Sequence, residues 1–190
     1  LVDPDNRRPV DFARRQAMLA ELEAELAGGG GSRFALARRL AHQVRDPRIK
    51  LFVTWQLLKL RQERTELFRR GAYAPLAVEG PGVQHVCAFA RRWAPSGQRP
   101  QTIVAVVPRL LARLAAGRVP SGAGCGGLDT AAPPLGPAFW ADTRLLLVGE
   151  ACGRLRNVFT GQIYDPAGGS LPVANLLSDF PVAVLCDAEA

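Results

Sequence analysis

The sequence predicts an α+β fold: an N-terminal helical segment, then an all-β antiparallel sandwich domain. Up to Arg70, apolar residues recur with the 3.6-residue period of amphipathic helices. From Gly71 onward, short β-rich runs are separated by Gly, Pro and Asn, which is typical of antiparallel sandwiches. The chain has 190 residues, 48% of them hydrophobic, so it can bury a core. We therefore expect two domains, 1–70 and 71–190.

Three helices are expected in the first part. Asp11 can cap a helix over 12–27, which the glycines at 28–31 then end. Ser32 can cap a second helix over 33–44. Asp46-Pro47 favours a third helix over 47–68, because proline is well suited to the first helical position. The third helix would be apolar around most of its circumference, so we expect it to be buried on more than one side.

The second part predicts six strands and one long loop. The loop is the Gly/Pro-rich stretch 117–137, which has little periodicity. The strand patterns cover residues 73–79, 83–93, 102–107, 143–148, 154–159 and 182–186.

Charge and hydropathy narrow the classes of partner. The formal net charge of +7 would suit nucleic acid, but the arginines are scattered in pairs and form no single block. We expect a generally basic surface and no nucleic-acid partner. No run approaches the roughly 18 apolar residues of a transmembrane helix, so we expect no membrane partner.

Neither a metal nor a cofactor is predicted. The four cysteines are widely spaced without a CxxC pair, and there are only two histidines. Gly122–Gly127 fits G-x-G-x-x-G, but it lacks the preceding strand and following helix of a dinucleotide site. Cys87 and Cys186 lie in apolar runs and are expected to be buried, reduced thiols, which favours a cytoplasmic location.

The opening segment Leu1–Asp11 is dense in polar groups on a proline-stiffened loop. Two interpretations stay open. Arg7 and Arg8 could pair with neighbouring aspartates as a structural clasp. Alternatively the segment binds a ligand, since Asp, Asn and Arg make paired hydrogen bonds to sugar hydroxyls.

Several blocks of this sequence together carry a resemblance to a known family. The most specific blocks are Leu1–Asp11 and Asp46–Leu51, the latter continuing through Thr54-Trp55 and Leu57–Arg61. Shorter blocks follow at 85–91, 106–109, 140–143 and 157–161. In this order the blocks resemble the C-terminal part of the maltooligosyltrehalose synthases, a family of the α-amylase superfamily of glycoside hydrolases. The resemblance spans nearly the whole chain, except for the Gly-rich stretches at 28–32 and 117–137.

This resemblance implies an enzyme that converts the reducing-end α-1,4 bond of a maltooligosaccharide into an α,α-1,1 bond, by a retaining mechanism in a (β/α)8 barrel. Residues 1–70 would be the last loop and helices of that barrel. The catalytic carboxylates of the superfamily lie upstream of the segment that Leu1 begins, so no catalytic residue is expected here. As a fragment, the chain is expected to be inactive alone.

The resemblance also suggests substrate contacts. Asp5, Asn6, Arg7 and Arg8 would lie at the barrel rim and contact reducing-end glucose units, and Lys50 could reach the same pocket. The expected partners are a maltooligosaccharide, bound through the parent enzyme, and the missing barrel portion. Without barrel strands the helices would leave apolar surface open, which predicts self-association. The alternative function is a non-catalytic carbohydrate-binding or structural β-sandwich module.

Overall fold

The computed structural model describes residues 9–27, 32–97, 99–116, 133–147, 153–166 and 168–188 of the chain. Four helices come first, and the predicted helix over 12–27 is confirmed. The predicted third helix is divided at Arg64, where the backbone leaves the helical region (φ −115°, ψ 39°). The helices are α1 (Phe12–Ala27), α2 (Arg33–His42), α3 (Arg48–Glu63) and α4 (Thr65–Arg70).

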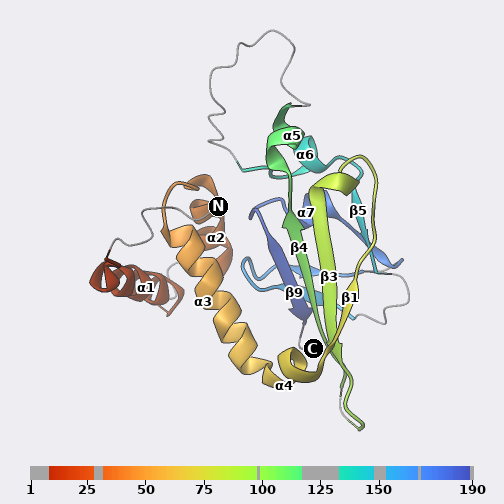
Figure 1. Cartoon of the computed structure of the whole chain (residues 1–190), viewed down its shortest axis with the longest axis horizontal. Helices are drawn as coiled ribbons and strands as arrows, with labels where there is room; N and C mark the ends of the chain where they lie inside the picture. The colour runs from red at the N-terminus through yellow and green to blue at the C-terminus, as the bar shows by residue number, and fades with distance from the viewer. Residues whose placement is uncertain are drawn as a thin grey trace.

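Within the described residues, nine strands follow in two antiparallel sheets, the larger of which stands at the centre of Figure 1. In the six-stranded sheet the order is β1 (Ala72–Pro75), β3 (Val86–Trp93), β4 (Gln101–Pro108), β9 (Ala183–Asp187), β6 (Leu155–Asn157) and β7 (Ile163–Tyr164). The three-stranded sheet has the order β2 (Val78–Glu79), β5 (Arg144–Leu146) and β8 (Ser170–Pro172). Short helical turns lie between strands: η1 (Val83–His85), α5 (Leu111–Ala116), α6 (Pro137–Trp140) and α7 (Val173–Leu176).

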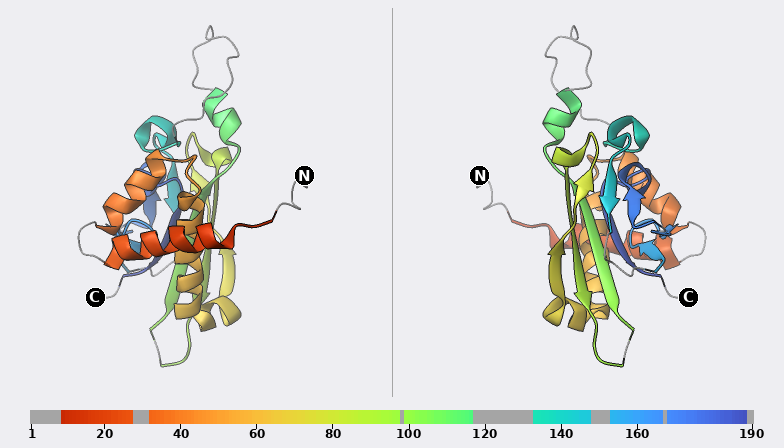
Figure 2. Two further views of the ribbon diagram at one scale, coloured as in Figure 1. Left: turned by 90° about the vertical axis from the view of Figure 1, so that its left-hand side faces the viewer. Right: turned by 90° about the vertical axis from the view of Figure 1, so that its right-hand side faces the viewer.

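The six-stranded sheet is buried on both faces, as its central strand β4 shows. Alternate strand residues point to opposite faces. Val104 and Val106 join a core that includes the three-stranded sheet, α6 and α7. Ile103 and Ala105 join a second core, shared with the helices. The molecule therefore has helices on one face of the large sheet and the small sheet on the other (Figure 2), and the predicted α+β class is confirmed.

The helices bury their apolar residues against this chain's own sheet. Leu22, Leu40 and Phe52 are fully buried, together with sheet-side residues such as Phe159 and Phe180. Phe12 and Leu58 nevertheless remain exposed on the helices, and the expected self-association stays a prediction.

The expected burial of the third helix on more than one side is met in part, and the expected burial of Cys87 is wrong. On α3 only one stripe is fully buried, at Phe52, Gln56 and Leu60, while Leu58 is 60% exposed. Partly buried residues of α3 also pack against this core, namely Ile49, Leu51, Val53, Trp55 and Leu57, and the helix contacts α1 and α2 as well. Burial of α3 therefore extends beyond one stripe. Cys87 is exposed, since its side chain alternates with the buried Val86 and Ala88 on β3; Cys186 is buried as expected.

The structure bears on both the predicted long loop and the expectation about membrane-spanning helices. The predicted loop at 117–137 lies outside the described residues up to position 132, and Pro137 begins α6. Within the described ranges, no helix has the length and apolar character needed to cross a bilayer.

Candidate functional site

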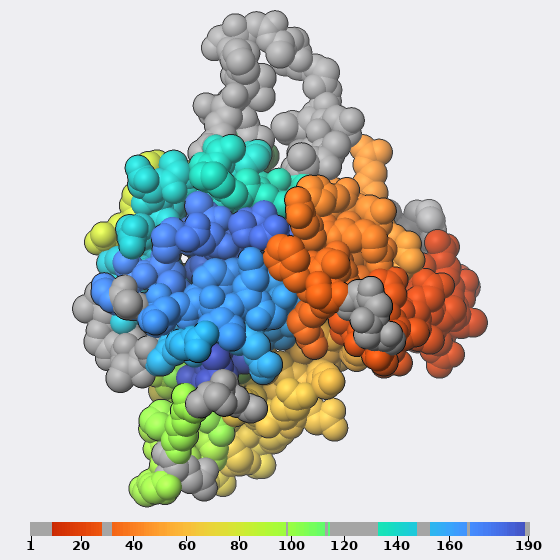
Figure 3. Space-filling view, turned by 180° about the vertical axis from the view of Figure 1, so that it is seen from behind, coloured from red at the N-terminus to blue at the C-terminus, as the bar shows by residue number. Residues whose placement is uncertain are grey.

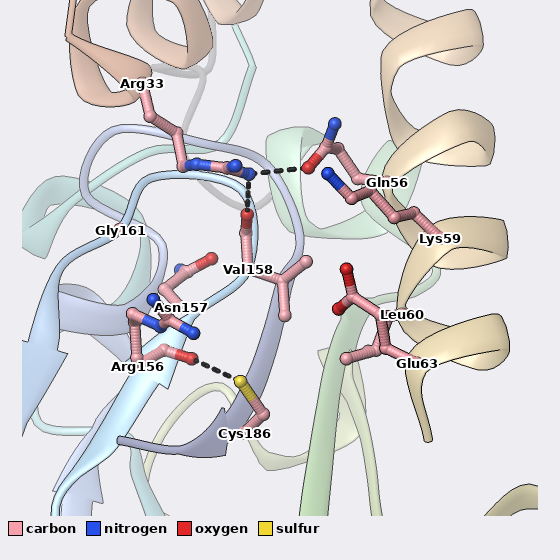
Figure 4. A pocket seen from close by; sticks show the side chains of 10 residues that line it. All are labelled: Arg33, Gln56, Lys59, Leu60, Glu63, Arg156, Asn157, Val158, Gly161 and Cys186. Atoms are coloured by element: carbon pink, nitrogen blue, oxygen red, sulfur yellow. Dashed lines mark hydrogen bonds between the residues drawn. The ribbon is translucent and has the colours of Figure 1, made fainter. Parts of the chain in front are cut away.

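A polar groove lies between helix α3 and the turn that follows strand β6 (Figure 4). Its volume is about 330 Å³. Leu60, Val158, Gly161 and Cys186 supply its less polar parts. Its hydrogen-bonding and charged groups come from three separate regions of the chain: Arg33, Gln56, Lys59, Glu63, Arg156 and Asn157.

Arg33 joins the helices to the sheet at one end of the groove. The Ser32 hydroxyl caps α2 by accepting from the Ala35 amide at 3.1 Å, which makes Arg33 the first helical residue. The Arg33 guanidinium donates to Gln56 Oε1 at 2.5 Å and to the Val158 carbonyl at 2.8 Å. Burial, followed by the positive charge of Arg156, lowers the pKa of Arg33, while Glu63 acts in the opposite direction. Figure 3 shows the same junction from behind, with α2 directly beside the C-terminal part of the sheet.

Asn157 shapes the turn that forms the opposite wall. It is fully buried, and its Oδ1 accepts from the Phe159 amide at 2.9 Å and the Thr160 amide at 3.4 Å. Gly161 then adopts a positive φ of 78°, and its amide donates to the Asn157 carbonyl at 2.8 Å. This turn presents the Val158 carbonyl to Arg33. The Asn157 Nδ2 makes no hydrogen bond of normal geometry. The Asn157 side-chain amide lies near Tyr164 and lowers the pKa of that residue, but burial raises this pKa by more.

The remaining charged side chains lie at the open side of the groove. Lys59 and Glu63 project from α3, and Arg156 projects from β6; all three are exposed. The Cys186 thiol is buried and lies 3.6 Å from the Arg156 carbonyl, to which it can donate. Burial raises the pKa of Cys186, so the thiolate needed for nucleophilic chemistry is disfavoured.

The side chains that line the groove suit ligand binding better than bond cleavage. Glu63 is the only carboxylate among its lining residues, whereas a retaining glycosidase uses a pair about 5–5.5 Å apart. No group of three or more His, Cys, Asp or Glu residues in the described part of the chain could hold a metal ion.

Comparison with known proteins identifies relatives of this chain. In two strains of Mycobacterium tuberculosis, a protein named "Putative maltooligosyl trehalose synthase" is 30% identical to it over 185 residues. The match covers 97% of this chain. The chain is homologous to a short segment of that synthase. It spans 16% of the length of these mycobacterial relatives. No family model matches the chain, and no solved structure matches it.

Two of the sequence blocks that resemble maltooligosyl trehalose synthase contribute to the groove. The block 157–161 forms its turn, and the block Leu57–Arg61 on α3 includes Lys59 and Leu60. Two blocks that lie far apart along the chain therefore meet at one place through helix–sheet packing.

The residues predicted to contact substrate are not brought into this groove. Asp5, Asn6, Arg7 and Arg8 lie outside the described residues. Lys50 is exposed near the start of α3 and does not line the groove. Lys50 precedes Lys59 by nine residues. At 3.6 residues per turn, this spacing puts the two residues on roughly opposite sides of the helix. The role predicted for these five residues stays a prediction.

Sequence reasoning missed Arg33, Gln56 and Arg156 as members of a site. One signal for Gln56 was available, because it is a polar residue on the buried stripe of α3, four residues after Phe52 and four before Leu60. No sequence signal separates Arg33 or Arg156 from the other scattered arginines.

Proposed function

We propose that this chain is a segment of a (1→4)-α-D-glucan 1-α-D-glucosylmutase, the enzyme that converts the reducing-end α-1,4 bond of a maltooligosaccharide into an α,α-1,1 bond. The observation that carries the proposal is homology over 97% of the chain to proteins named as trehalose synthases. The chain matches only 16% of the length of those relatives, which supports a role as one part of a larger enzyme.

In this proposal the chemistry belongs to the upstream barrel. The attacking carboxylate and the acid that protonates the leaving oxygen would come from there. Asp5, Asn6, Arg7, Arg8 and Lys50 would bind reducing-end glucose units beside them, in a cytoplasmic enzyme. Residues 1–70 would form the last loop and helices of that barrel, and the β domain from about Gly71 would pack against it.

The test is an exchange of segments. The chain alone, a mycobacterial relative, and a chimera of that relative carrying this chain in place of its matching segment are each incubated with maltopentaose. Loss of reducing ends is followed. We expect loss with the relative and the chimera and none with the chain alone. Loss with the isolated chain, or a folded chimera that is inactive beside an active relative, would contradict the proposal.

The alternative, a non-catalytic carbohydrate-binding or structural module, is favoured by one observation: the groove has hydrogen-bonding groups but a single carboxylate. Binding of maltopentaose by the isolated chain, measured by calorimetry, together with an inactive chimera, would favour this second function.

A further inference from the structure

The groove beside α3 carries more positive than negative charge. Three of its charged side chains are cationic, Arg33, Lys59 and Arg156, and Glu63 is the one anion. Within the described ranges, none of the three cations forms an ion pair with a carboxylate. Some surface arginines elsewhere do form ion pairs: Arg39 pairs with Glu25, and Arg48 with Asp46.

Arg33 is held in place without having its charge neutralised. Its two hydrogen-bond acceptors, Gln56 Oε1 and the Val158 carbonyl, are neutral. Partial burial of a cation and proximity to a second cation both carry a free-energy cost. An anion bound between Arg33, Lys59 and Arg156 would offset that cost, and arginine and lysine are the side chains that proteins use to bind phosphate.

The other polar groups suit hydroxyls. The Glu63 carboxylate points into the groove from α3, and the Gln56 amide lies at the same wall (Figure 4). The volume of about 330 Å³ falls at the lower end of the range for small-molecule pockets, about 300–1,000 Å³.

We propose that this groove binds a phosphorylated monosaccharide, with the phosphoryl group between Lys59, Arg156 and Arg33 and the sugar hydroxyls toward Glu63 and Gln56. The proposal rests on the groove alone and does not depend on the mutase activity. Its failure would therefore leave the segment-exchange experiment above unaffected.

Calorimetric titration of the whole chain tests the proposal. The probes are glucose 6-phosphate, glucose and inorganic phosphate. The double variant Lys59→Gln/Arg156→Gln removes two groove cations, and Arg61→Gln/Arg109→Gln is the matched control: it makes the same change in net charge at two exposed arginines outside the groove. We expect glucose 6-phosphate to bind more tightly than either other probe. The groove variant should weaken its binding at least about tenfold, and the control variant should leave it unchanged.

A second measurement locates the bound sugar phosphate. Amide resonances of Gly161 and the Asn157 side chain should shift when glucose 6-phosphate is added to labelled protein. Absence of binding, equal weakening in the control variant, or shifts confined to other regions would overturn the proposal. Glucose or inorganic phosphate binding as tightly as glucose 6-phosphate would also overturn it.

Discussion

At the scale of single residues, Phe52 links the helical layer to the sheet. Its ring lies 6.2 Å from that of Phe159 and 6.0 Å from that of Phe180, measured between centroids. Both partners are fully buried and lie close to each other, at 5.1 Å. Such tilted and edge-on contacts are favourable for aromatic rings. The cluster therefore joins α3 to the segments that follow β6 and precede β9.

Replacing Phe52 by Ala should lower the free energy of unfolding by about 3–5 kcal/mol, because it leaves a cavity in this cluster. Urea denaturation measures the change. Leu58→Ala, on the same helix but at a 60% exposed position, should change the free energy by no more than about 0.5 kcal/mol. Equal losses in the two variants would contradict the assigned packing.

Tyr164 should titrate at unusually high pH. Burial raises the pKa of Tyr164 to about 12. The hydroxyl also lies 3.1 Å from Gln162 Oε1 and 3.3 Å from the Asn175 carbonyl, two acceptors that favour the protonated phenol. Because the folded state holds the proton more tightly than the unfolded state, this contribution to stability is complete below about pH 10. It is lost as the pH rises toward 12.

Ultraviolet titration can isolate this group, since the chain has only two tyrosines. We expect Tyr164→Phe to remove an ionisation near pH 12. We also expect a weaker fall in the free energy of unfolding between pH 10 and pH 12 in this variant than in the parent. A titration curve near pH 12 that is unchanged by the substitution would refute the assignment.

At the scale of elements, the passage from helix α4 to strand β1 depends on Gly71. Its amide donates the last helical hydrogen bond, to the Leu67 carbonyl at 2.9 Å, and its extended backbone (φ −62°, ψ 135°) then ends the helix. A Cβ at this position would lie 2.3 Å from the Leu67 carbonyl oxygen and 2.9 Å from that of Arg92. Both contacts are with backbone atoms, which cannot rotate away.

Gly71→Ala should therefore destabilise the protein, by about 1–3 kcal/mol, through overpacking at the junction. Thermal and urea unfolding measure the loss. Gly153→Ala is the matched control, because the nearest atom to its added Cβ would be Arg99 Nη2 at 3.9 Å. If Gly71→Ala is as stable as this control, the backbone at the junction accommodates a Cβ and the prediction is wrong.

At the scale of the whole molecule, the helices and the strands share a core. Ile103, Ala105 and Val184 of the sheet pack in the same cluster as Leu40 and Phe52 of the helices. The predicted division at residue 70 marks the change from helices to strands. That the two parts are separate domains stays a prediction.

Unfolding experiments decide how strongly the parts depend on each other. Because of the shared core, we expect one cooperative transition, with the helical circular dichroism and the tryptophan fluorescence coinciding along the urea axis. Two separated transitions would mean that residues 1–70 and 71–190 unfold independently.

The sequence by itself determined the types of the longer elements and the point where helices give way to strands. Local periodicity and caps carry that information, as at Asp11 and Ser32. It did not reveal β7 or β8, whose two or three residues are too few to show a period. Only the tertiary structure decided that β9 pairs with both β4 and β6, and that Arg33, Gln56 and Asn157 meet in one groove. These neighbours are far apart along the chain, and burial of the two faces of one sheet brings them together.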